Sequence, residues 1–170
     1  VRFPGTKVSL IGVNLLEQYD HDKLIDMISA EKAKGQYVVT FLHWGNEYQT
    51  QHSASQEREA HWMIDSGVDM IIGSHPHVVQ DSEVYQGRLI VYSLGNFIFD
   101  QFFSDETQEG CLVAIELSEQ KVKAVFVPTI EKKVKPELAK SHIRTKILDR
   151  IVPSSGYLSR PKDDTIELTR

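Results

Sequence analysis

The alternation of apolar and polar segments along the first ninety residues predicts a layered α/β fold. Short apolar and β-branched runs predict strands at Val8–Val13, Tyr37–Leu42, Val68–Ile72 and Arg88–Leu94. The second run is apolar at nearly every position, which is typical of a strand buried on both faces of a parallel sheet. Because helical segments separate the first three runs, we expect a largely parallel sheet at the start of the fold.

Two helices are predicted between these strands. Lys23–Lys34 carries a rough apolar stripe, and either Asp20 or Asp22 is placed to cap its first turn. Ser53–Gln56 has the pattern of a capping box, in which a serine and a glutamine three residues later satisfy each other's backbone N–H groups. This motif predicts a second helix over about Ser55–Asp65.

The later part of the chain has a different pattern. Cys111–Leu117 and Val122–Val127 are apolar runs joined by a short polar turn, which predicts an antiparallel hairpin in a second sheet layer. Glu137–Val152 is expected to form one more helix, with Pro153 ending it. The polar tail Ser154–Arg170 is expected to be loosely ordered.

Charge divides the chain into two parts. The 170 residues carry 19 basic and 24 acidic side chains, and this excess of acid argues against nucleic-acid binding. Residues 1–130 hold 9 basic and 18 acidic side chains, whereas residues 131–170 hold 10 and 6. We interpret residues 1–130 as the α/β domain and residues 131–170 as a basic C-terminal extension. Its charge fits a solvated surface as well as a partner-binding role.

The cysteine count and the hydropathy exclude disulfide-stabilised folds, cysteine-rich zinc sites and transmembrane helices from the classes that this sequence could belong to. Cys111 is the one cysteine, so an intrachain disulfide framework and a cysteine-rich zinc site are both ruled out. No apolar stretch approaches the roughly 18 residues that a transmembrane helix needs.

Three of the seven histidines fall where the topology predicts a ligand site. His43 directly follows one buried strand, and His75 and His77 follow the next. The carboxyl ends of parallel strands meet at one edge of the sheet, where ligands of such folds bind. Pro76 is expected to hold His75 in an extended conformation, so that His75 and His77 point the same way. We therefore expect the three imidazoles to share one small volume.

Imidazole nitrogens suit zinc and iron and, together with carboxylates, manganese. From spacing alone, a metal site and a group of ordinary histidines are equally favoured. Glu47, Asn46 and Asn96 are the nearest oxygen-bearing candidates. Asn96 follows a glycine at a strand end, so it can be a ligand, a substrate hydrogen-bond donor or simply a turn residue. The other histidines, His21, His52, His61 and His142, are interpreted as ordinary surface or core residues.

The order of these motifs resembles the bacterial poly-γ-glutamate capsule-biosynthesis family of the CapA type, within the calcineurin-like metallophosphatase superfamily. The resemblance extends over about residues 6–130. The motifs that carry it are His43–Tyr48, Gln56 with Ala60, Gly67–Asp69, Gly73–His77 and Tyr92–Phe97.

The resemblance implies the C-terminal half of a four-layer α/β/β/α sandwich around two divalent ions, with manganese, zinc or iron as the candidates. His43, His75 and His77 correspond to metal ligands of the superfamily, and Glu47 and Asn96 to residues of its catalytic pocket. The implied function is metal-dependent hydrolysis of a phosphoester or polymer during capsule synthesis. The alternatives are a non-catalytic part in capsule assembly or export, and a phosphoesterase unrelated to capsule.

The sequence also departs from the superfamily pattern. The superfamily's first aspartate, its Gly-Asp pair and its Asn-His block do not occur before His43. We therefore expect the missing oxygen ligands to come from a preceding segment or a partner chain. We expect this chain alone to bind at most one divalent ion weakly and to lack phosphoesterase activity. The family resemblance further implies a capsule-synthesis membrane complex at the bacterial cell surface, with a membrane anchor outside this span.

Overall fold

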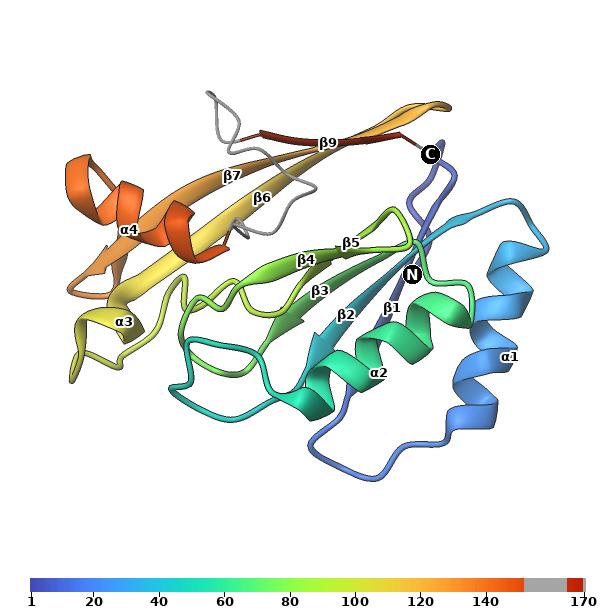
Figure 1. The fold of residues 1–170 in the computed structure, drawn as a ribbon, viewed down its shortest axis with the longest axis horizontal. Coiled ribbons are helices and arrows are strands. Elements are labelled where there is room, and N and C mark those ends of the chain that lie inside the picture. The colour runs from blue at the N-terminus through green and yellow to red at the C-terminus, as the bar shows by residue number, and fades with distance from the viewer. Residues whose placement is uncertain (152–164, 170) are drawn as a thin grey trace.

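The computed structural model describes residues 1–151 and 165–169 as two stacked sheets with helices (Figure 1). Its elements, in chain order, are β1 (Val8–Asn14), α1 (His21–Lys32), β2 (Tyr37–His43), α2 (Ala54–Asp65), β3 (Met70–Ser74), β4 (Ser82–Tyr85), β5 (Arg88–Val91), α3 (Asp105–Gln108), β6 (Glu109–Leu117), β7 (Lys121–Lys132), β8 (Lys135–Leu138), α4 (Ser141–Ile151) and β9 (Thr165–Thr169). The apolar runs of the first ninety residues form the strands expected of them, with ends shifted by a few residues.

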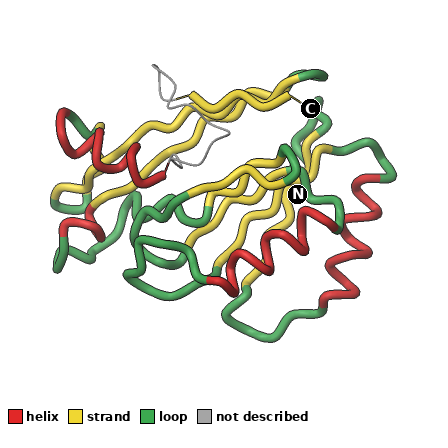
Figure 2. The backbone as a smooth tube through the Cα atoms, in the orientation of Figure 1, coloured by secondary structure: helices red, strands yellow, loops and turns green. Residues whose placement is uncertain are grey.

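The first sheet has the strand order β1-β2-β3-β5-β4. As predicted, β1, β2, β3 and β5 run parallel, and the register places His43 beside Ser74. Strand β4, which pairs antiparallel with β5 as the outermost strand, was not predicted. Because β2, β3 and β5 are parallel, the loops that follow them all emerge where the carboxyl ends of these strands meet (Figure 2).

Helices α1 and α2 cover one face of this sheet (Figure 1). Their apolar sides supply Leu24, Ile28 and Met63 to a cluster with the sheet residues Val38 and Ile71. The predicted caps are present. The Asp20 side chain accepts a hydrogen bond from the backbone N–H of Lys23, and Ser53 and Gln56 form both halves of the capping box. These caps satisfy N–H groups that a helix start otherwise leaves unpaired.

The second sheet is antiparallel, which confirms the predicted hairpin. Strand β6 pairs with β7 along its whole length, and Ser118 bonds to Lys121 across the turn between them. Strand β7 also pairs with β8 and β9. The described residues thus form an α layer and two β layers of the mixed α/β arrangement expected for part of a metallophosphatase-like sandwich.

The core between the two sheets also takes in α4. Ile147, Leu148 and Ile151 of this helix belong to the same apolar cluster as Met70 of β3 and Phe126 of β7. This cluster joins residues from both halves of the chain, because side chains from the facing sides of the two sheets meet there.

A buried ion-pair group attaches α4 to β6. Glu109 is 2% exposed and pairs with Lys146 over 2.8 Å and with Arg150 over 3.0 Å. A buried carboxylate needs such partners, because an unpaired buried charge costs several kcal/mol.

Two expectations for the C-terminal part are wrong. The helix expected over Glu137–Val152 begins only at Ser141, because residues 135–138 form β8 at the edge of β7. Pro136 is tolerated there, since an edge strand leaves some N–H groups unused. In the tail expected to be loosely ordered, residues 165–169 form β9, and Ile166 is buried against the core. Residues 152–164 and 170, and with them the helix end expected at Pro153, lie outside the described part of the chain.

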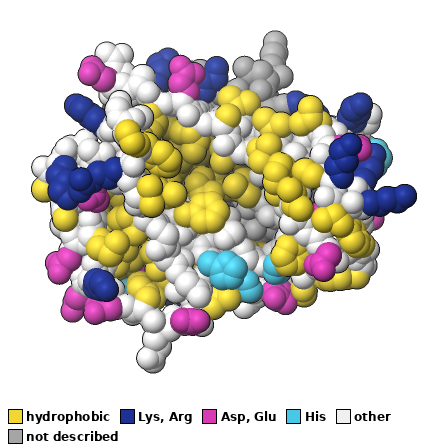
Figure 3. Space-filling model, turned by 180° about the vertical axis from the view of Figure 1, so that it is seen from behind, with side chains coloured by type: hydrophobic (Ala, Val, Ile, Leu, Met, Phe, Trp, Pro, Cys, Tyr) yellow, Lys and Arg dark blue, Asp and Glu magenta, His cyan; other side chains and the backbone are white. Residues whose placement is uncertain are grey.

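One side of the sandwich leaves apolar side chains of the inner faces exposed. Phe41 shares a strand face with the buried Tyr37 and Val39 yet is 43% exposed, and Ile115 of β6 is 37% exposed. Figure 3 shows hydrophobic side chains gathered around a hollow on one face of the molecule, with histidine at its lower margin. Within residues 1–151 and 165–169, no helix is long and apolar enough to cross a membrane.

Candidate metal centre

Three imidazoles lie together where β2 and β3 end, as their positions after these strands predicted. His43 is the last residue of β2, and His75 and His77 follow β3. The ring centroids of His43 and His75 are 4.6 Å apart, and those of His75 and His77 are 5.8 Å apart. We call these three residues the histidine edge.

The extended backbone conformation predicted for His75 and His77 around Pro76 is wrong. His75 has a φ of 97° and His77 a φ of 60°, so neither adopts the ordinary extended conformation. Pro76 disfavours the helical region for His75, but tertiary contacts select a left-handed conformation instead. Among these contacts, the backbone N–H of Tyr48 donates to the Pro76 carbonyl over 2.8 Å. Conformations of this kind cost about 1–3 kcal/mol and tend to occur at functional sites.

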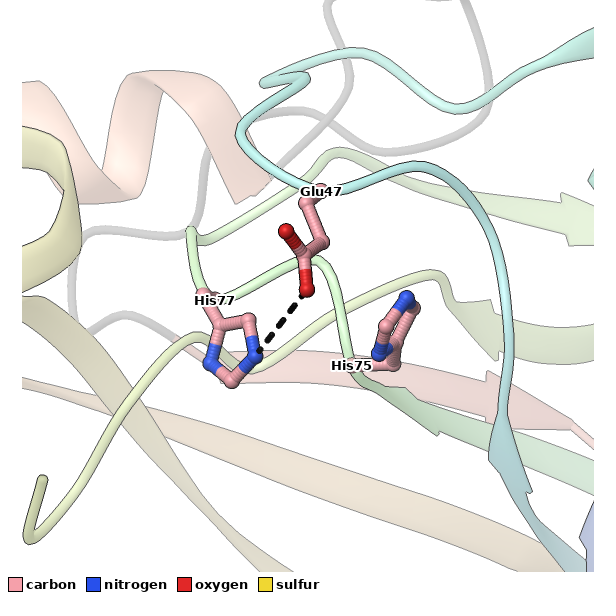
Figure 4. A group of neighbouring side chains, drawn as sticks. All are labelled: Glu47, His75 and His77. Carbon is pink, nitrogen blue, oxygen red and sulfur yellow. Dashed lines mark ion pairs between the residues drawn. The ribbon is translucent and has the colours of Figure 1, made fainter. Parts of the chain in front are cut away.

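The Glu47 carboxylate points toward the space beside the His75 and His77 rings (Figure 4). Its Oε1 lies 3.9 Å from Nε2 of His77. One ligand atom from each of Glu47, His75 and His77 lies within 4.8 Å of the others. Two nitrogens and one carboxylate oxygen this close fit a single divalent ion after small side-chain movements, and His43 lies next to this group. Two ions would need more oxygen ligands.

Asn96 orients His77. Its side-chain NH₂ donates to the Thr107 carbonyl over 2.9 Å, which turns its oxygen toward Nδ1 of His77 at 3.0 Å. Because an amide oxygen only accepts, Nδ1 carries the proton in neutral His77 and Nε2 is left free toward Glu47. Asn96 thus positions His77, a role other than the three that its place in the sequence suggested. A hydrogen-bond acceptor on the ring nitrogen that does not bind the metal fixes the ring plane of a metal-binding histidine.

The environment favours neutral His75. Partial burial lowers the pKa of His75 below its usual value, and the neighbouring His43 lowers it further. Neutral imidazole is the form that binds metals. The histidine edge therefore holds at least one nitrogen ligand in the required protonation state.

Aromatic residues form one wall of the site. The ring of Tyr48 stacks 6.1 Å from His77 and meets Phe103 edge-on at 5.1 Å, and Phe99 lies 4.9 Å from His77. Gln101 donates to the Tyr48 hydroxyl over 3.1 Å. Tyr48 and Phe103 are 41% and 66% exposed, so this wall faces outward. Residues 98–103 were not among the predicted site residues, although five of the seven in 97–103 are apolar.

A close backbone approach at Gly73 positions the two histidine loops. A side-chain Cβ at this position would lie 2.0 Å from the carbonyl oxygen of Tyr92 and 2.4 Å from Nε1 of Trp44. Trp44 is 2% exposed and packs in the core. Only glycine permits this approach.

Comparisons with known proteins agree with the motif order. The model of the family described as "Bacterial capsule synthesis protein PGA_cap" matches residues 5–101. The capsule biosynthesis protein CapA of Bacillus anthracis is 35% identical over 157 residues, which is 86% of this chain and 38% of that protein. The PGA biosynthesis protein CapA of Bacillus subtilis is 44% identical over 98 residues, 58% of this chain and 26% of that protein. A probable polyglutamine synthesis accessory protein of Mycobacterium tuberculosis is 29% identical over 79 residues, or 46% of this chain and 21% of its own length. The chain thus spans well under half of these relatives.

Proposed function

Because the chain belongs to the bacterial capsule synthesis protein family PGA_cap, we propose that it takes part in making a poly-γ-glutamate capsule. Within that role we propose a hydrolase, with the histidine edge at the centre of its active site. The supporting observation is the convergence of His75, His77 and Glu47, whose ligand atoms lie within 4.8 Å of one another.

The proposed cofactors are divalent ions of the manganese, zinc or iron type. His75 and His77 with Glu47 would hold one ion, and His43 is placed to serve a second in the complete domain. Such an ion would polarise a phosphoryl or carbonyl group and lower the pKa of a water molecule.

The chain's own residues prepare this site for binding. Asn96 holds the His77 ring so that Nε2 stays free, and the low pKa of His75 keeps its nitrogen unprotonated. The aromatic wall of Tyr48, Phe99 and Phe103 restricts water on the His77 side and offers a surface to a substrate. The proposed substrate is a phosphoester or the glutamate polymer itself.

We propose that the remaining ligands come from a segment or partner chain that packs on the side of the sandwich where Phe41 and Ile115 are exposed, which we call the open side. The exposed inner-face residues Phe41 and Ile115 support this proposal, as does the greater length of the relatives. Exposed apolar patches on a soluble domain commonly mark such contacts. Because a capsule is assembled outside the cell, we place the complete protein in a capsule-synthesis membrane complex at the bacterial surface, with its anchor outside residues 1–170.

The experiment is a hydrolysis assay on the full-length protein with added manganese, paired with capsule measurement in cells. We expect turnover of a phosphoester or of γ-glutamyl polymer to fall at least about a hundredfold in His75→Ala, with capsule lost. His142→Ala, at an exposed position of α4, is the matched control and should change neither measurement. Capsule loss in His75→Ala without turnover in any assay of the unaltered protein would instead support an assembly role. Normal capsule and normal turnover in His75→Ala would rule out the proposed site.

A further inference from the structure

A second group of ligand-type side chains lies between helix α2 and the edge strand β4. One ligand atom from each of Glu57, His61 and Glu83 lies within 4.8 Å of the others. We call these three residues the lateral cluster. We propose that the lateral cluster is a binding site for a zinc-type divalent cation that fastens α2 to β4.

Regular secondary structure brings the three side chains together. Glu57 and His61 are four residues apart on α2 and so lie on the same side of the helix. Glu83 lies on β4 and alternates with Ser82, whose hydroxyl bonds to the Ile151 carbonyl on the opposite face of the sheet. Glu83 therefore points toward α2. The site rests on a helix and a strand, which hold ligands more firmly than loops do.

Two of the ligands are already held in place. The His61 ring stacks on Tyr85 with centroids 3.7 Å apart and planes only 7° from parallel. Glu83 accepts a hydrogen bond of 2.7 Å from the hydroxyl of Tyr92, a residue that is fully buried. Carboxylates and imidazoles that bind metals are commonly fixed by such outer contacts.

The third ligand is available. Within the described residues, no hydrogen bond or ion pair engages the carboxylate of Glu57, which is half-buried. His61 Nε2 lies 2.7 Å from Glu83 Oε1, so a proton lies between these two atoms. A cation would displace this proton and separate the two atoms to about 3.3 Å, the spacing of tetrahedral zinc ligands.

The ligand chemistry selects zinc over harder ions. Two carboxylates and a neutral imidazole balance the two positive charges of the cation, and nitrogen ligands favour zinc over magnesium. Water would complete the coordination, because all three side chains are only partly buried. No residue of this cluster belongs to the histidine edge, so the inference does not rest on the proposed function.

The test is calorimetric titration of the chain with zinc, with magnesium as the comparison ion. The histidine edge is first silenced in a His43→Ala/His75→Ala background. We expect that background to retain one zinc per chain and to bind no magnesium. Adding His61→Phe, which keeps an aromatic ring on Tyr85, or Glu57→Gln should weaken zinc binding at least tenfold. Glu59→Gln, on the same helix, is the matched control for charge and should leave zinc affinity unchanged.

Zinc binding that is absent from the background, seen only in millimolar zinc, or insensitive to both His61→Phe and Glu57→Gln would overturn the proposal. If the double-alanine background does not fold, the same decision comes from the otherwise unaltered chain. There Glu57→Gln, at a side chain that no hydrogen bond or ion pair engages within the described residues, should remove one zinc from the measured stoichiometry, and an unchanged stoichiometry would overturn the proposal.

Discussion

The indole N–H of Trp44 donates a hydrogen bond of 2.9 Å to the main-chain carbonyl of Tyr92, and the backbone of Gly73 passes beside this bond. Trp44 follows His43, Gly73 precedes His75 by two residues, and Tyr92 leads to Asn96. This one contact therefore ties together the three strand ends that carry the candidate metal centre.

Gly73→Ala should accordingly disrupt both the fold and the site. Its methyl group would lie 2.0 Å from the Tyr92 carbonyl oxygen, so the strands must separate. We expect a loss of about 3 kcal/mol in the free energy of unfolding, the upper part of the usual range for overpacking, and at least tenfold weaker manganese binding. Denaturant unfolding and calorimetry measure the two effects. Gly12→Ala in β1 is the control, because its methyl group would meet no atom within 4 Å. Equal stability of the two variants would contradict the prediction.

Asn96→Ala should weaken metal binding by about 10–100-fold, the usual effect of losing a partner that orients a ligand. The change removes the acceptor for His77 Nδ1 and frees the ring to turn. It also leaves the Thr107 carbonyl without its partner, at a cost of about 1–3 kcal/mol in stability. Titration with manganese measures the affinity. Gln120→Ala, at an exposed position in the turn between β6 and β7, should bind as the unaltered chain does. Unchanged affinity in Asn96→Ala would show that Asn96 does not position the ligand.

Stability should fall as the pH drops below about 6.5, the ordinary pKa of histidine. His75 has a lowered pKa in the folded state, so the unfolded chain binds more protons in this range and acid favours unfolding. His75→Asn should therefore lose less stability than the unaltered chain between pH 7.5 and pH 5.5. Urea unfolding at both pH values gives the comparison, with His142→Asn as control. An identical pH dependence in all three proteins would contradict the assignment to His75.

The 170-residue chain alone should bind at most one manganese ion at the histidine edge, weakly, and hydrolyse no aryl phosphate. Among the described residues, one carboxylate, that of Glu47, joins the histidines there. We also expect it to self-associate through the open side, which light scattering at rising concentration would detect. Phe41→Ser should reduce the association, whereas Met27→Ser, at an equally exposed position on α1, should not. Two tightly bound manganese ions or measurable turnover would show that the chain supplies a complete site.

The features that the sequence predicted correctly are those determined by neighbouring residues or by the order of the strands. The capping box at Ser53–Gln56 formed as expected because both partners lie within one helical turn. The approach of His43 to His75 followed from strand order alone, because parallel strands bring their ends to one edge.

The elements that the sequence did not reveal depend on distant partners. Strand β9 pairs with β7, some forty residues earlier. Its alternation of Ile166 and Leu168 with polar residues is a strand signal, but five residues do not identify the partner strand. The left-handed φ of His75 is stabilised by contacts with the loop of Tyr48, against the local preference before proline. His61 has no distinctive neighbour in sequence, and its partner Glu83 lies on a strand that was itself unanticipated.

The buried group around Glu109 changes what the basic C-terminal part of the chain offers to other molecules. Lys146 and Arg150 supply two of its positive charges, and both pair with this one carboxylate, although the Lys146 side chain is 42% exposed and that of Arg150 only 11%. Lys146 also contacts Glu106 over 3.1 Å. An acidic polymer that approached α4 would have to compete with the carboxylates of Glu106 and Glu109 for the same cations. The charge of residues 131–170 therefore serves in part to fix helix α4 onto the second sheet. The number of basic residues in this segment overstates how strongly it would attract a polyanion.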